Sequence, residues 1–76
     1  MEIFERYLVL GCDVAGRVLS GIRSEARFLG LELSQEPLAI FLTLNPTQTV
    51  KITARGNKLE EFIKYMDENY PLELEK

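Results

Sequence analysis

IFERYLVLGCDVAGRVLSGIRSEARFLG, residues 3–30, contains the change of hydrophobic period on which the fold depends. Aliphatic, aromatic and β-branched residues dominate 3–10, which predicts a strand that ends at Gly11. From Val14 onwards the apolar residues recur every three or four positions, which predicts an amphipathic helix over 14–29. The chain is therefore expected to begin with a strand that leads directly into a helix.

Both ends of the expected helix carry residues suited to them. Asp13 is a good N-cap, because its carboxylate can accept a hydrogen bond from a free N–H of the first turn. Gly30 suits the position just after the helix, where glycine adopts the left-handed conformation at little cost. In the preceding strand, residues 7–10 are apolar on both faces, which is typical of a strand inside a sheet.

The second half of the chain has the pattern of a β-hairpin. Residues 37–44, PLAIFLTL, predict a strand that Pro37 begins, since proline disrupts the middle of a strand. Residues 48–55, QTVKITAR, alternate between apolar and polar side chains, as in a strand with one buried face. Residues 45–47, NPT, are expected to form the turn between the two strands.

A second helix is expected over residues 58–69, and Tyr70-Pro71 should end it. Asn57 stands where a capping box would place its Ser or Thr, three residues before Glu60. The last alternating residues, 72–75, are compatible with a short strand or with a frayed end, and the sequence leaves this open.

The order of these elements predicts an α+β fold in a single domain, residues 1–76. Two split βαβ units make a ferredoxin-like βαββα(β) sandwich, in which two helices cover one face of an antiparallel sheet. The other face would carry no helix. We expect a second copy of the chain to pair with this uncovered face through Ala39, Phe41 and Thr43.

Composition excludes several classes of chemistry. The 76 residues include no histidine and one cysteine, so a Ser-His-Asp triad, a histidine metal ligand and an internal disulfide are all excluded. We expect no catalytic residues, no metal and no cofactor. The low cysteine content and the short apolar runs favour a cytoplasmic protein without a membrane segment. For Cys12, a reactive thiol and a simply buried one both remain open.

Small size favours self-association, because a core of this size seldom supplies more than ~3–5 kcal/mol of stability. We therefore expect a homodimer. The alternative is a protein- or RNA-contact subunit that uses the basic residues of the first helix, Arg17, Arg23 and Arg27. A net charge of −3 makes nucleic acid the less favoured partner.

Asp13-Val14-Ala15-Gly16, followed by Gly30-Leu31-Glu32-Leu33, resembles the opening of an ACT-type regulatory domain. That family has Asp-x-Pro-Gly at its first strand-to-helix turn, and Ala15 stands here in place of the proline. The resemblance implies a dimer that binds a small carboxylate ligand such as an amino acid through Asp13, Val14, Ala15 and Gly16. Together these observations predict a small non-enzymatic binding or assembly module.

Overall fold

The computed structural model describes residues 3–71 and confirms the α+β class. The elements follow the order β1 (Ile3–Gly11), α1 (Cys12–Phe28), β2 (Glu32–Phe41), β3 (Thr47–Arg55) and α2 (Leu59–Asn69). Residues 72–75, for which a short strand and a frayed end were both open, lie outside the described residues.

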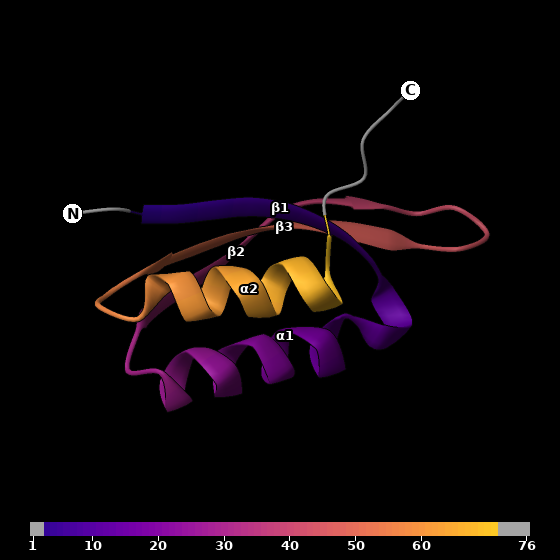
Figure 1. Cartoon of the computed structure of the whole chain (residues 1–76). Coiled ribbons are helices and arrows are strands. Elements are labelled where there is room, and N and C mark those ends of the chain that lie inside the picture. Colours follow the sequence, from indigo (N-terminus) through magenta and orange to yellow (C-terminus); the bar gives the residue numbers. More distant parts are fainter. Residues whose placement is uncertain (1–2, 72–76) are drawn as a thin grey trace, which may run out of the picture.

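The three strands form an antiparallel sheet in the order β1-β3-β2, and both helices cover the same face of it (Figure 1). Within residues 3–71, β1 is therefore an edge strand. The apolar residues on both of its faces predict an interior strand, and because the expected last strand, 72–75, lies outside the described residues, this stays a prediction. No other described element lies on the second face, which we call the open sheet face.

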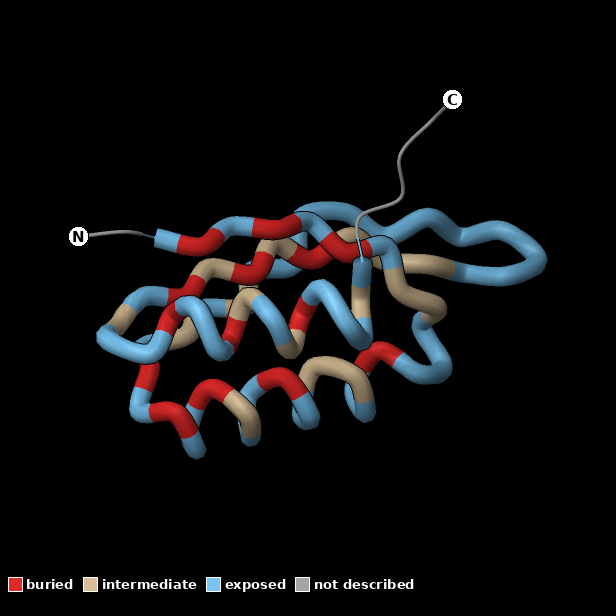
Figure 2. Tube along the Cα trace, in the orientation of Figure 1, coloured by how far each residue is buried: buried red, intermediate tan, exposed pale blue. Residues whose placement is uncertain are grey.

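The core lies between the sheet and the helices. Val50, Ile52 and Ala54 of the central strand are buried, which confirms the alternation predicted for 48–55. Phe62 of α2 and Ile22 of α1 are among the largest fully buried side chains, and they pack against these residues. Figure 2 shows buried positions alternating along β1 and β3 and recurring on the inner sides of the helices.

The first helix differs from its prediction at its start. It begins at Cys12, Gly11 occupies the N-cap position, and Asp13 lies in the first turn without a capping hydrogen bond. The Cys12 N–H donates to the carbonyl of Pro46 in the β2–β3 hairpin over 2.9 Å. Because this hydrogen bond satisfies the first N–H of the helix, α1 can begin at Cys12.

The end of α1 agrees with the prediction. Gly30 has a φ of +72°, and its N–H donates to the carbonyl of Arg27. The Leu31 N–H reaches back to the carbonyl of Ala26 over 2.9 Å, which completes a Schellman motif. The helical spacing places Ile22, Ala26 and Leu29 in the core, where Ala15 joins them, whereas Phe28 is 83% exposed.

Strand β2 begins earlier and ends earlier than the predicted 37–44. Pro37 lies in its middle, where the prediction had excluded it. Proline is tolerated there because β2 is an edge strand and its register with β3 shifts between Pro37 and Ala39.

Helix α2 starts at Leu59 with Lys58 as its N-cap, and no side chain caps it, so the predicted capping box at Asn57 does not form. The turn before it passes through Gly56, whose φ is +148° and where an added Cβ would lie 2.5 Å from Leu31 Cδ2. Because the backbone at Gly56 lies against Leu31, α2 begins close to the sheet, and its first residue, Leu59, is buried in the core.

Candidate functional site

The most exposed apolar part of the described chain is the tip of the β2–β3 hairpin, residues 38–47, which we call the hairpin arm. Beside it, β1 ends at the pair Gly11–Thr47, and in Figure 1 the arm projects past β1 and both helices. Its large apolar side chains are all between about half and fully exposed: Leu38, Ile40, Phe41, Leu42 and Leu44. No residue of the arm is charged.

The arm continues into one half of the open sheet face. Residues directly opposite each other on antiparallel strands point to the same face. Thr49 pairs with Val9 on one side and with Ala39 on the other, and Thr47 pairs with Phe41. This end of the open sheet face is therefore apolar and uncharged, and we call it the apolar half.

The other half of the open sheet face is charged, and most of its charges are paired within the chain, although Glu36, opposite Lys51, forms no ion pair with another described residue. Lys51 Nζ lies 3.5 Å from Glu5, and Arg55 Nε donates to Glu32 over 2.7 Å. Exposed pairs of this kind contribute little stability, but they leave few charges in need of a partner.

The structure separates the three residues expected at the self-association surface. Ala39 and Phe41 lie within the arm and point to the open sheet face. Thr43 lies beyond the end of β2, in the tip turn, where its hydroxyl donates to the carbonyl of Asn45 over 3.1 Å. Its predicted place on the sheet face is therefore wrong, because the strand ends at Phe41 and the chain has already begun to turn.

A surface hollow of about 550 Å³ lies at the base of the arm, against the start of α1. It is lined by Gly11, Cys12 and Asp13 from the strand-to-helix turn and by residues 44–47 from the arm. None of these lining residues is basic, so the carboxylate of Asp13 is the charged group that a bound molecule would meet.

Of the four residues expected to bind a ligand, the structure brings only Asp13 into this hollow. Ala15 faces the core and is buried, whereas Val14 and Gly16 are exposed on other sides of α1. Open space surrounds Gly16, so it provides no close approach to another element. A carboxylate ligand at these residues stays a prediction.

The three arginines of the first helix have different environments. Arg23 donates to Gln35 over 2.7 Å, and Gln35 donates to the carbonyl of Leu19, which ties α1 to β2. Arg17 and Arg27 are exposed. The RNA-contact alternative is thus left with two arginines that form no ion pair with another residue of 3–71, and it also stays a prediction.

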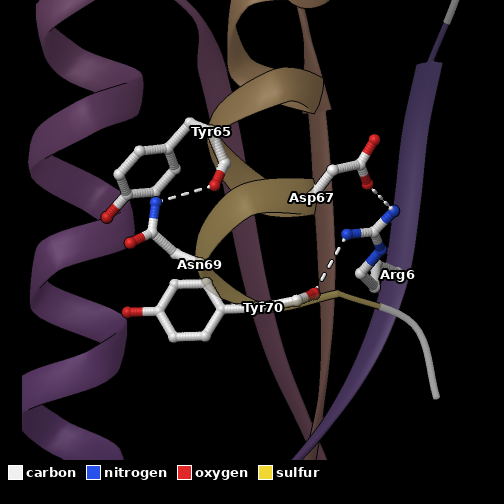
Figure 3. Close-up of polar contacts among 5 residues, drawn as sticks. All are labelled: Arg6, Tyr65, Asp67, Asn69 and Tyr70. Carbon is white, nitrogen blue, oxygen red and sulfur yellow. Dashed lines mark hydrogen bonds and ion pairs between the residues drawn. The ribbon is translucent and has the colours of Figure 1, made fainter.

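A buried arginine on β1 was missed in the sequence analysis. Arg6 is only 8% exposed, and its guanidinium donates to Asp67 over 2.7 Å and to the carbonyl of Tyr70 over 3.1 Å (Figure 3). It also lies 5.0 Å from the centre of the Phe4 ring. The sequence signal was present, since Arg6 stands between Phe4 and Leu8 on the inward side of an alternating strand.

The cluster in Figure 3 fastens the end of α2 to the sheet. Asn69 donates to the carbonyl of Tyr65 within the last turn, over 2.9 Å. The Tyr65 ring stacks at 6.3 Å from Phe62, and burial, followed by the nearby Tyr70 and Glu25, raises the pKa of the Tyr65 hydroxyl. Each of these contacts holds structure together, and none resembles a nucleophile with its base.

Among residues 3–71, no group of three or more acidic or cysteine side chains converges as a metal site would require. No helix in this part of the chain is both long and apolar enough to cross a membrane. No family model, curated protein or solved structure matches the chain. The surfaces described above are therefore the observations that bear on function.

Proposed function

We propose that this chain is a small non-enzymatic assembly module that functions as a homodimer. The observation that carries this proposal is the hairpin arm, a β-hairpin tip without charges whose large apolar residues are all exposed. Contiguous apolar surface of this kind on a small protein marks an interaction site.

Self-association would also compensate for the small core. Burying one Leu or Phe side chain that was exposed contributes ~1.5–3 kcal/mol. A few such side chains at an interface would match the ~3–5 kcal/mol that a single core of this size provides. Folding and pairing would then support each other.

Analytical ultracentrifugation over a range of concentrations tests the proposal. We expect the mass of two chains at micromolar concentration, with dissociation on dilution. A single-chain mass at every concentration up to about a millimolar would overturn the homodimer.

We further propose that the fold is ferredoxin-like. The strand order β1-β3-β2 supports this, because β3 lies between two strands that a helix connects, as in a split βαβ unit. The helices on one face support it too. A fourth strand of that fold would lie beside β1, and amide hydrogen exchange of the whole chain would test whether that edge is protected.

The hollow beside Asp13 favours a second candidate function, the binding of a small amino acid. The amine of such a ligand would face the Asp13 carboxylate, while its own carboxylate would have no basic residue among those lining the hollow. A thermal shift assay with the twenty amino acids tests this, because a ligand that binds only the native state must raise the melting temperature. A rise that Asp13→Asn abolishes would support the site, and a flat response would discard it.

A further inference from the structure

We infer that the second copy packs face to face on the open sheet face, apolar half against apolar half, and leaves the helix side of the hairpin arm uncovered. This inference rests on the proposed homodimer and specifies its interface. With a two-fold axis through the apolar half, each copy would contribute the same surface patch to the interface.

The distribution of charge on the open sheet face supports this position for the second copy. Stable interfaces have an uncharged apolar centre and a polar rim. The open sheet face has this arrangement, since Val9, Ala39 and Phe41 form its uncharged end. The charged residues begin at Lys51 and Glu36 in the middle of the face and continue to Arg55 and Glu32 at the opposite end, so they would lie along one side of the rim.

The available area also fits. The apolar half and the tip of the arm expose more than half of each of four large side chains: Val9, Phe41, Leu42 and Leu44. Side chains of this size would offer on the order of 100 Å² apiece, which supplies about half of the roughly 800 Å² that each partner buries in a standard interface.

The helix layer is the competing surface, and it is less suitable. Its outer side combines the arginines of α1 with the acidic residues of α2, such as Glu60, Glu61 and Glu68. A dimer through this layer would depend on exposed ion pairs, which contribute little and are screened by salt. A dimer through the apolar half would be largely insensitive to salt.

Two neighbouring residues of the arm give a matched test. Phe41 is 56% exposed and pairs with Thr47 on the open sheet face, whereas Ile40 is 60% exposed and pairs with Gln48 on the helix side. We expect Phe41→Ser to raise the dimer dissociation constant at least ~30-fold, the effect of losing an interface hot spot. Ile40→Ser should change it less than about threefold, because serine at this position removes similar apolar area outside the interface.

A second pair tests the two ends of the same face. Val9→Lys should abolish the dimer, because it places like charges at the two-fold axis. Ile3→Lys adds the same charge at the far, charged end and should leave dimerisation nearly unchanged. Circular dichroism of each variant establishes that it remains folded.

The outcomes separate this inference from the proposed function. Equal weakening by Phe41→Ser and Ile40→Ser would show that the partner surrounds the arm, and would overturn the face-to-face arrangement while keeping the homodimer. A dimer that dissociates as salt is raised and resists both substitutions would assign the interface to the helix layer, with the same consequence. A wild-type chain that stays monomeric would overturn the proposed function itself.

Discussion

Arg6 in β1 donates a hydrogen bond to Asp67 in α2 over 2.7 Å, and the two residues are 61 positions apart in the chain. Only the side chain of Arg6 is buried, since that of Asp67 is 55% exposed. The same guanidinium holds the carbonyl of Tyr70, where α2 ends. One buried cation therefore joins an edge strand to the end of the last helix.

Removing the charge of Asp67 should loosen this attachment. We expect Asp67→Asn to lower the free energy of unfolding by about 1–2 kcal/mol, because Arg6 then keeps its charge in a buried site with a weaker acceptor. Urea unfolding measures the loss, at one fixed protein concentration because pairing also stabilises the chain. The exposed neighbour Glu68 provides the control, and Glu68→Gln should change stability by less than about 0.5 kcal/mol. Equal losses would mean that the ion pair contributes nothing specific.

Two glycines with free space around them should respond to alanine in opposite ways. An added Cβ meets nothing within 4 Å at either Gly16 or Gly30, so only the backbone conformation distinguishes them. Gly16 lies inside α1, where alanine should stabilise by about 0.5–1 kcal/mol. Gly30 has a φ of +72°, and alanine there should cost about 1 kcal/mol. Melting temperatures measure both, and a shift of the same sign in the two variants would contradict this account.

Alkaline pH should destabilise the fold in part through Tyr65. Its pKa is raised from 10.0 in the folded chain, chiefly by burial and then by Tyr70 and Glu25, so the folded state retains this proton at a pH where the unfolded chain has lost it. The stability that this proton contributes is complete below about pH 10 and decreases as the pH rises above it. Tyr65→Phe should therefore lose less stability than the wild type between about pH 8 and pH 11. The exposed Tyr7 serves as a control, and an identical decrease in Tyr65→Phe and Tyr7→Phe would contradict the assignment.

RNA binding should be weak or absent. The net charge is −3, and within α1 the guanidinium of Arg23 already binds Gln35. Fluorescence anisotropy with a labelled single-stranded RNA at ~50 mM salt should show no binding, because neutralised phosphates are the main source of affinity at low salt. Binding that weakens with salt and disappears in an Arg17→Glu, Arg27→Glu double variant would instead favour the RNA-contact alternative.

Several parts of the fold could be predicted because they depend on local patterns. The alternation around Ile52 specifies a strand with one buried face in almost any context. Gly30 was predictable because the left-handed turn after a helix requires little beyond glycine itself. The apolar stripe of α2, including Phe62 and Met66, appears in the sequence with helical spacing and is buried in the structure.

The candidate site was only partly predictable. Ala39 and Phe41 were assigned to the uncovered face from their position in the strand, and the register with β3 confirms that place. Thr43 was assigned wrongly because the end of a strand depends on where its partner strand stops. The exposure of the arm could not be anticipated, since a run such as 38–44 is equally typical of a buried strand.

The sequence by itself determined the order and the type of the elements, because hydrophobic period, turn residues and glycine positions act within a few neighbouring residues. Only the tertiary structure decided which strands lie at the edges and where the helix caps form. It also decided that Arg6 meets Asp67, and that the hairpin tip extends beyond every other described element. Those features depend on contacts between segments far apart in the chain, and such contacts are selected by the packing of the whole molecule.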